Sequence, residues 1–474
     1  MNIFRLMEIS AAQATRCTVE ATVASGLESV PASEFKNAFL AEHCTSRGRV
    51  FANVLSSQIP EVLQMRSVDN LSLVAEVTKD ITFSTADKEQ DLKKLEKLAY
   101  AIHWDKTLLL WKKSTDFHGI LYPTRDQYVA SLAVEKELKS KLKSSLQESV
   151  SEIDNDQNME KEHEVQEESQ SLNNNICREK KAANILLYNQ LDSRKLSEKV
   201  LKFRVTCYHT GSHAFGSQEA ATAFGGTLQD IFNWVVDLTY YDLEIVLNIK
   251  EDFVYVTVPL TKESLHRRSI TYFGPTTLRS TICYGMLTIA SPEVGDIIID
   301  PLCGGGSIPI EGALSFPGSL FLSGDIHPKA IERTKLNINE LTAKHVSNID
   351  VFNWDAQKLP LKDSCIDLCV TDLPFGKRMG SKKNNSTLYV RLLFELSRVM
   401  KTSGRAVFLT YDKGNFVRAV STIHGLFKMI RILTVNIGGL AARLYVIQRT
   451  AKEYQQSLPL EVKKRRKKKN KLEK

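Results

Sequence analysis

The feature that most constrains the fold is a regular alternation of short apolar segments with helical segments between residues 265 and 450. The apolar segments that could form buried strands lie at 297–299, 321–323, 351–353, 366–370 and 406–410. Strands that alternate with helices predict a doubly wound, mostly parallel sheet. Two further strand candidates, 429–436 and 444–448, flank a short connection that contains Gly438 and Gly439. We therefore expect an α/β domain over 263–452 whose sheet ends in an antiparallel hairpin.

The residues before this domain indicate smaller α+β units. Strand-like segments at 17–23, 49–55 and 71–77 precede a segment with leucines at helical spacing, 91–102. A second group combines a helix at 217–236 with three strands, which lie at 201–207, 242–249 and 253–259. We expect an N-terminal tail at 1–16, one α+β domain at 17–115 and a second at 199–262.

Two segments have compositions that predict disorder. Residues 147–175 carry nine acidic residues and one basic residue, and no aromatic residue lies between Tyr128 and Tyr188. Such a stretch buries too little apolar surface to offset the entropy of ordering, so we interpret 116–198 as a linker with a disordered acidic insert that has some helix at its ends. The end of the chain, 453–474, is a basic tail. Its basic run at 463–469 fits a nuclear signal, a non-specific RNA contact or only a solvated end.

Bulk properties restrict the class of protein. No apolar run reaches the roughly 18 residues that a membrane span needs, so no membrane segment is expected. The eight cysteines form no C-x-x-C pair, which argues against a zinc site or a disulfide framework and favours a reducing compartment. The N-terminus lacks a secretory pattern, and we therefore expect a cytoplasmic protein with no metal. The net charge of +8 is compatible with a polyanionic partner, although many ordinary domains reach that charge.

The first strand of the α/β domain is followed by a glycine-rich turn, Asp300-Pro-Leu-Cys-Gly-Gly-Gly306. Glycines let the backbone approach a ligand closely, and the helix that follows offers free N–H groups to a carboxylate. Asp300 can accept a hydrogen bond from an ammonium group. Together these features suit the amino-acid end of S-adenosylmethionine, with Asp300, Cys303, Gly304 and Gly306 as candidate contacts. A ligand-free turn is the alternative, while a dinucleotide fingerprint would place a third glycine where Pro309 lies.

Two acidic residues follow the next strands. Asp325 comes about 20 residues after the glycine turn, where an acid can bind both hydroxyls of a ribose. Asp355 follows the third strand and can accept a hydrogen bond from an adenine amino group. A capping or surface role for Asp355 fits nearly as well.

The fourth strand leads into Asp372-Leu-Pro-Phe375, which points to the reaction. The lone pair of an amino group on an aromatic base is delocalised into the ring. An enzyme that accepts hydrogen bonds from both N–H groups steers this nitrogen towards a tetrahedral geometry and stabilises the developing charge. Asp372 supplies one acceptor, and the backbone carbonyl of Leu373 or Pro374 can supply the other. Phe375 can stack on a base taken out of its stack; the alternative is a turn closed by proline and glycine.

Basic residues follow this turn and could contact the phosphates of a nucleic acid. Those in the loop are Lys377, Arg378, Lys382 and Lys383. A mobile, solvated loop is the alternative interpretation.

Taken together, the chain resembles the THUMP-domain family of tRNA guanosine N2-methyltransferases. The resemblance covers 199–450 well and 17–115 more loosely. The segments that carry it are Leu265-His-Arg-Arg268, Phe273-Gly-Pro-Thr-Thr-Leu-Arg-Ser280, Asp300-Pro-Leu-Cys-Gly304, Thr371-Asp-Leu-Pro-Phe-Gly376 and Val435-Asn-Ile-Gly-Gly-Leu440. One departure lies in the glycine turn, which reads Gly304-Gly-Gly306 where relatives usually have Gly-Thr-Gly.

The resemblance implies a ferredoxin-like domain at 17–115 and a THUMP core at 199–262, which together hold the acceptor end of tRNA. A Rossmann-like domain would form N2-methylguanosine in the acceptor stem, at position 6 in close relatives, and a small zinc-binding subunit would activate it. The matching motifs make Asp372, Pro374 and Phe375 catalytic, and they add Arg267 and Arg268 as candidate RNA contacts. Rival functions are methylation of adenine N6 or of a protein glutamine, and RNA binding without catalysis. The intact Asp300 and Asp372 argue against the last.

Overall fold

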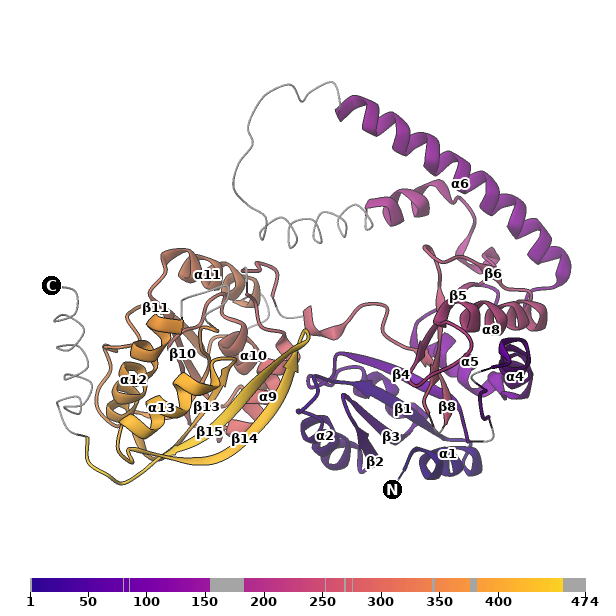
Figure 1. Ribbon diagram of the computed structural model, residues 1–474. Coiled ribbons are helices and arrows are strands. Elements are labelled where there is room, and N and C mark those ends of the chain that lie inside the picture. The colour runs from indigo at the N-terminus through magenta and orange to yellow at the C-terminus, as the bar shows by residue number, and fades with distance from the viewer. Residues whose placement is uncertain are drawn as a thin grey trace.

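The computed structural model describes residues 2–79, 81–84, 86–153, 183–251, 253–267, 270–274, 276–342, 346–375 and 382–454. Figure 1 shows two bodies side by side, an N-terminal α+β body and a C-terminal α/β body. Between them runs a connection that includes the 3₁₀ turn η3 (Leu265–Arg267). No helix within these ranges is both long and apolar enough to cross a membrane.

The N-terminal body is built on a single sheet of eight strands in the order β2-β3-β1-β4-β8-β7-β5-β6. The strands are β1 (Arg16–Thr22), β2 (Glu42–Ser46), β3 (Arg49–Leu55), β4 (Asn70–Thr78), β5 (Lys202–His209), β6 (Val235–Val236), β7 (Leu243–Ile249) and β8 (Val254–Pro259). Antiparallel pairing of β4 with β8 joins the two strand groups that the sequence separates. The two α+β units therefore share one sheet rather than facing each other as independent domains.

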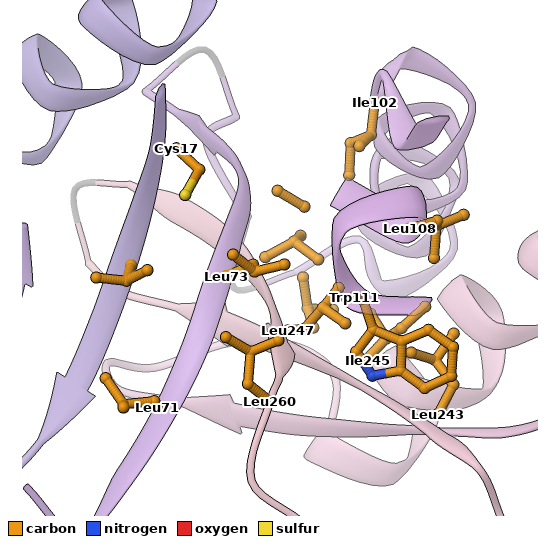
Figure 2. Close-up of a cluster of buried hydrophobic side chains, with 14 of the residues drawn as sticks. Cys17, Leu71, Leu73, Ile102, Leu108, Trp111, Leu243, Ile245, Leu247 and Leu260 are labelled. Atoms are coloured by element: carbon orange, nitrogen blue, oxygen red, sulfur yellow. The ribbon is translucent and has the colours of Figure 1, made fainter. Parts of the chain in front are cut away.

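Helices cover this sheet and complete its core. They are α2 (Ser29–Phe39), α3 (Ile59–Val62), α4 (Lys88–Ala101), α5 (Trp104–Ser114) and α8 (Ser217–Phe232), with the 3₁₀ turns η1 (Ser56–Gln58) and η2 (Leu196–Glu198). Figure 2 shows Leu73 of β4, Ile245 of β7 and Trp111 of α5 directed towards one another. The helix expected at 217–236 ends earlier, because Asn233 adopts a left-handed conformation that caps it.

The N-terminal tail expected at 1–16 is wrong, because most of it is helix α1 (Ile3–Ala12). The Asn2 side chain accepts a hydrogen bond from Arg5 N at 3.0 Å and caps the helix. Ile3 and Leu6 are buried against Phe51 and other residues of the sheet. Two apolar side chains one turn apart are enough to dock a short helix, and a composition average does not detect them.

The linker expected at 116–198 is ordered at both ends. Helix α6 (Arg125–Ile153) extends beyond the body in Figure 1, and residues 183–191 form a further helix. Leu138 and Leu142 of α6 pack against Tyr188, whose hydroxyl donates a hydrogen bond to Glu135. Arg194 also binds Glu135, with 2.8 Å between nitrogen and oxygen. The helices expected at the ends of the insert are thus present, while the rest of the acidic insert, 154–182, lies outside the described residues.

The C-terminal body confirms the expected α/β fold. Its sheet has the order β11-β10-β9-β12-β13-β15-β14, in which β11 to β13 pair in parallel and β15 is antiparallel to both neighbours. The strands are β9 (Ile297–Asp300), β10 (Leu320–Asp325), β11 (Ile349–Asn353), β12 (Ile366–Asp372), β13 (Met400–Thr410), β14 (Phe427–Ile437) and β15 (Leu440–Arg449). The helices are α9 (Ser280–Ala290), α10 (Ser307–Ser315), α11 (Pro328–Thr342), α12 (Lys382–Val399) and α13 (Lys413–Thr422). The hairpin turn is only Gly438 and Gly439, both with positive φ.

The two bodies share an apolar interface. Val23, Ala24 and Leu27, which follow β1, are buried in the core of the C-terminal body. Figure 1 shows the tip of the β14–β15 hairpin directed towards the N-terminal body. There Gly26, with φ of +101°, lies so close to Thr434 that a β-carbon would overlap its carbonyl oxygen.

Polar contacts across the interface add to this packing. Arg66 donates to both carboxylate oxygens of Glu311, a buried residue of α10, at 2.5 and 2.8 Å. Asp69 accepts hydrogen bonds from Thr281 at 2.6 Å and from Arg279 at 3.3 Å. A bidentate pair and a second carboxylate bond fix orientation as well as distance. The N-terminal body is therefore held in one position relative to α9 and α10.

We expect Leu27→Ala to destabilise the C-terminal body, although Leu27 belongs to the N-terminal one. Removing a buried leucine side chain typically costs about 2–5 kcal/mol. Chemical denaturation should show this loss, and Leu40→Ala, at a position 85% exposed, is the control. A Leu27→Ala protein as stable as the control would show that the interface contributes little.

Candidate active site at the carboxyl edge of the second sheet

Three carboxylates end three neighbouring parallel strands. Asp325 ends β10, Asp300 ends β9 and Asp372 ends β12, and these strands are adjacent in the sheet. The carboxyl ends of parallel strands meet at one edge, where ligands bind in open α/β sheets. The structure thus brings together three residues that the sequence analysis selected separately.

The glycine turn lies between two of these strand ends. Gly304 N donates to the Asp325 carboxylate at 3.2 Å, and the Thr334 hydroxyl donates to the Gly304 carbonyl at 3.0 Å. Gly304 and Gly306 have φ of +55° and +84°, a region that favours glycine. A β-carbon on Gly304 would meet open space, whereas one on Gly306 would press on Thr334. The open side of Gly304 and the start of α10 can therefore receive a ligand.

Cys303, a candidate cofactor contact from the sequence analysis, has a buried side chain. Its N–H donates to the Gly324 carbonyl at 3.0 Å, and its sulfur lies 3.8 Å from the Thr334 hydroxyl. Burial raises the pKa of this thiol well above its usual value. These contacts indicate that Cys303 packs beneath the turn.

Burial, together with neighbouring carboxylates, raises the pKa values of Asp300 and Asp372. Burial raises the pKa of Asp300 well above its usual range, and the charges of Asp372 and Asp325 add to this, while the Thr371 hydroxyl and Leu302 N oppose it. Burial, with the charge of Asp325, raises the pKa of Asp372 to about 7. A site with excess negative charge favours a cationic ligand. S-adenosylmethionine, with its sulfonium and ammonium groups, fits this requirement.

Asp325 and Asp355 also have roles within the fold. Asp325 accepts from His327 N at 2.9 Å as well as from Gly304 N, and its oxygens retain lone pairs for a ribose. Asp355 Oδ1 accepts from the backbone and side chain of Gln357, at 2.9 and 3.2 Å. Asp355 therefore closes its own turn, as its capping alternative requires, and only Oδ2 remains for an adenine contact.

The Asp372–Phe375 turn is held by its neighbours. Leu373 N donates to the Leu409 carbonyl at 2.8 Å, which continues the pairing of β12 with β13. The Pro374 carbonyl accepts from Asn385 at 2.8 Å and from Tyr389 at 2.6 Å. A carbonyl oxygen has two lone pairs, so that of Pro374 is fully used. Of the two backbone acceptors that the sequence leaves open, Leu373 is the one that can still serve a substrate.

Phe375 has an aromatic neighbour that the sequence analysis missed. Its half-buried ring lies 6.5 Å from that of Tyr411, at an interplanar angle of 35°. Tyr411 directly follows β13, and its place at the end of a parallel strand could have singled it out.

The candidate RNA contacts lie largely outside the described residues. Arg268, Lys377 and Arg378 lie outside the described residues, as do the side chains of Arg267, Lys382 and Lys383. The backbone places Arg267 at the end of η3 and Lys382 at the start of α12.

A second residue missed from the sequence is Asn337 of α11, which is 2% exposed. Its Oδ1 accepts from Thr271 N and Tyr272 N at 3.2 and 2.9 Å. Its Nδ2 donates to the carbonyls of Tyr272 and Gly305 at 3.1 and 3.0 Å. One amide thus ties the connecting segment to the glycine turn. Nothing in the sequence distinguishes it from other asparagines on helices.

We expect Asn337→Ala to weaken cofactor binding, because the glycine turn loses its link to residues 271–272. Leaving buried polar groups unpaired costs about 1–3 kcal/mol, roughly 5- to 150-fold in affinity. Calorimetry with S-adenosylhomocysteine measures this, and Lys335→Ala, on the exposed face of the same helix, is the control. Unchanged affinity would separate Asn337 from the cofactor site.

Comparisons with known proteins agree with this geometry. Residues 267–443 match the family model described as RMKL-like, methyltransferase domain, and residues 185–259 match the THUMP domain model. The second match begins within the helix at 183–191 that packs on α6.

Whole-chain similarities extend further. The Bos taurus protein tRNA (guanine(6)-N(2))-methyltransferase THUMP3 is 38% identical over 462 residues, which cover 92% of this chain and 89% of the relative. The crystal structure of TrmN from Thermus thermophilus has a TM-score of 0.63 at 20% identity and covers 91% of this chain and 99% of its own. SMU.472, solved in complex with SAH, has a TM-score of 0.59 at 13% identity, with 93% and 100% covered. The chain therefore belongs to the family of THUMP-domain methyltransferases that includes bovine THUMP3.

Proposed function

We propose that this protein is an S-adenosylmethionine-dependent methyltransferase that forms N2-methylguanosine in tRNA, at guanosine 6 of the acceptor stem. The names of its relatives support the substrate and the position. The observation that carries the proposal is the position of Asp372 beside the Leu373 carbonyl, at the same sheet edge as Asp300 and Asp325. Two acceptors for an amino group then lie next to the carboxylates of a cofactor site.

The chemistry follows from these acceptors. The Asp372 carboxylate and the Leu373 carbonyl accept the two N–H groups of the guanine amino nitrogen, which directs its lone pair out of the ring plane. Phe375 stacks on the extruded base and holds it in place. S-adenosylmethionine, when bound, supplies the methyl group. Asp300, Gly304, Gly306 and Asp325 would hold it, with Asp355 as a further contact through Oδ2.

Selection of one guanosine requires a second landmark on the tRNA. We propose that the ferredoxin-like strands at 17–115 and the THUMP core at 199–262 grip the acceptor end as one body. The interface formed by Leu27, Arg66 and Asp69 supports this role, since it sets a fixed distance between that body and Asp372. Phosphate contacts made by this body would weaken as salt rises.

The test is mass spectrometry of nucleosides from tRNA incubated with the purified protein and labelled cofactor, with and without the candidate activating subunit. The proposal expects N2-methylguanosine, and much less of it from tRNA that lacks its 3′ end. A full-length protein is needed, because a 263–474 fragment would lack Val23, Ala24 and Leu27 from its core. N6-methyladenosine, label in protein, or no label at all would favour the rival functions.

We also propose that a small zinc-binding subunit, implied by the family resemblance, docks at the open edge of β11. Exposed apolar side chains gather beside this edge strand, among them Ile326, Leu336 and Phe352. A shallow groove lined by Ile331, Leu336 and other α11 residues adjoins them. The opposite edge strand, β14, is less open, because Asn436 N already donates to the Ser25 carbonyl at 2.9 Å. A partner could extend the sheet at β11.

We also propose a cytoplasmic location, because the N-terminus lacks a secretory pattern and the cysteines form no C-x-x-C pair. The cysteines in the described part of the chain are free thiols, as a reducing compartment predicts. A reporter fused to the basic run at 463–469 would test the nuclear alternative.

We expect the kcat/KM for methyl transfer to rise with pH through about 7, because Asp372 accepts hydrogen bonds fully only when ionised. Asp372→Ala should reduce the rate by roughly 10²–10³-fold, the usual cost of one lost electrostatic partner, with S-adenosylhomocysteine affinity within a few-fold. Asp372→Asn keeps one oxygen acceptor and should retain partial activity. Its kcat/KM should no longer fall as the pH drops below about 7. A rising profile that persists in Asp372→Asn would assign the pKa to another group.

For the partner, we expect Phe352→Asp to abolish co-purification with the activating subunit while leaving cofactor binding intact. A charge at the centre of an apolar contact is costly to desolvate. Ile432→Asp on β14 is the matched control, since Ile432 and Phe352 are exposed to 45% and 42%. Loss of the partner in the control alone would place the docking surface at the other edge.

A further inference from the structure

The Pro374 carbonyl is held by two side chains of one helix. Asn385 and Tyr389 of α12 lie four residues apart, and therefore on one helix face. Both are buried, at 1% and 0% exposure, and both donate to the same oxygen, at 2.8 and 2.6 Å. One donor would already satisfy a buried carbonyl. The second makes this oxygen a fixed point of the turn.

The hydrogen bond from Tyr389 is the end of a directed chain. Asp412 N donates to Thr410 Oγ1 at 3.0 Å, and the Thr410 and Tyr389 hydroxyls are 3.0 Å apart. Because the single proton of Tyr389 goes to Pro374, the Thr410 hydroxyl must donate to Tyr389. Burial raises the pKa of Tyr389, so it remains a donor throughout the ordinary pH range.

Asn385 joins the same network from its other hydrogen. Its amide lies 3.3 Å from Asp412 Oδ2, which also accepts from Asn415 at 2.8 Å. Asp412 caps α13 through Asn415 N at 3.4 Å. The turn after β12 is thereby tied to the start of α13 as well as to α12.

This network controls the carbonyl next to it. The ring of Pro374 fixes its φ, so the peptide between Leu373 and Pro374 has little freedom once its flanks are held. Leu373 N is held by the Leu409 carbonyl at 2.8 Å on one side, and the Pro374 oxygen is held on the other. The direction of the Leu373 carbonyl follows from both.

We propose that Asn385 and Tyr389 are positioning residues for methyl transfer, which aim the Leu373 carbonyl and the Phe375 ring by holding the Pro374 oxygen. The inference rests on the proposed function, in which that carbonyl accepts a hydrogen bond from the guanine amino group. It assigns the residues a role in kcat and none in cofactor or tRNA binding.

Tyr389→Phe tests the proposal by removing one oxygen atom. The kcat, and the rate constant of methyl transfer in a single turnover, should fall about 10- to 100-fold, as expected when an acceptor is misplaced by a fraction of an ångström. The KM for tRNA and the Kd for S-adenosylhomocysteine should stay within about two-fold. Tyr445→Phe is the matched control, since Tyr445 of β15 is a buried tyrosine stacked on Phe416, a ring that Tyr389 also contacts. Its kcat should equal that of the wild type.

Asn385→Ala is the second variant and leaves Tyr389 as the remaining donor, so the same split between kcat and binding is expected. Unchanged kcat in both variants overturns the proposal. A loss of kcat that comes with a similar fold-loss of cofactor affinity and a lower melting temperature also overturns it, because this pattern indicates a merely structural role. Failure of the wild-type protein to form N2-methylguanosine in the presence of the activating subunit would instead contradict the proposed function.

Discussion

A cluster of three carboxyl groups at the end of one sheet is the constraint on which the site depends. Asp300, Asp325 and Asp372 end neighbouring strands, and burial raises the pKa values of Asp300 and Asp372. A fold that gains nothing from such a cluster would replace it with apolar side chains, because burying unpaired charge is costly. A cationic cofactor relieves this cost, and the cluster thus favours a sulfonium ligand over the neutral product that remains after transfer.

The second constraint is the fixed relation between the two bodies. Leu27 fills the core of the methyltransferase body, and Arg66 binds Glu311 on α10, the helix that begins at the glycine turn. The residues that would grip RNA are therefore mechanically connected to those that would hold the cofactor. With such a connection, contacts between the N-terminal body and the RNA would decide which base reaches the small pocket. It also explains why the first strands cannot be treated as a detachable module.

Much of the site could be predicted from sequence because its residues follow buried strands at regular spacing. Asp300, Asp325 and Asp372 needed only the recognition of strand ends, and the glycine turn has a composition of its own. Helix α1 was missed, since its docking depends on the contacts of two buried side chains, Ile3 and Leu6, with the sheet. The shared eight-stranded sheet was missed because the pairing of β4 with β8 links residues more than 170 positions apart. Asn337 and the Asn385–Tyr389 pair gave no local signal, because their partners are backbone atoms brought near only by folding.

The central claim is that the Asp372 turn methylates the exocyclic amino nitrogen of one tRNA guanosine. The most direct measurement compares two tRNA transcripts that differ only at position 6, where one carries guanosine and the other inosine, which lacks the 2-amino group. Both are incubated with the full-length protein, its activating subunit and labelled cofactor, and their nucleosides are analysed by mass spectrometry. The account predicts one N2-methylguanosine per guanosine transcript and no label in the inosine transcript. Equal labelling of both transcripts would contradict it.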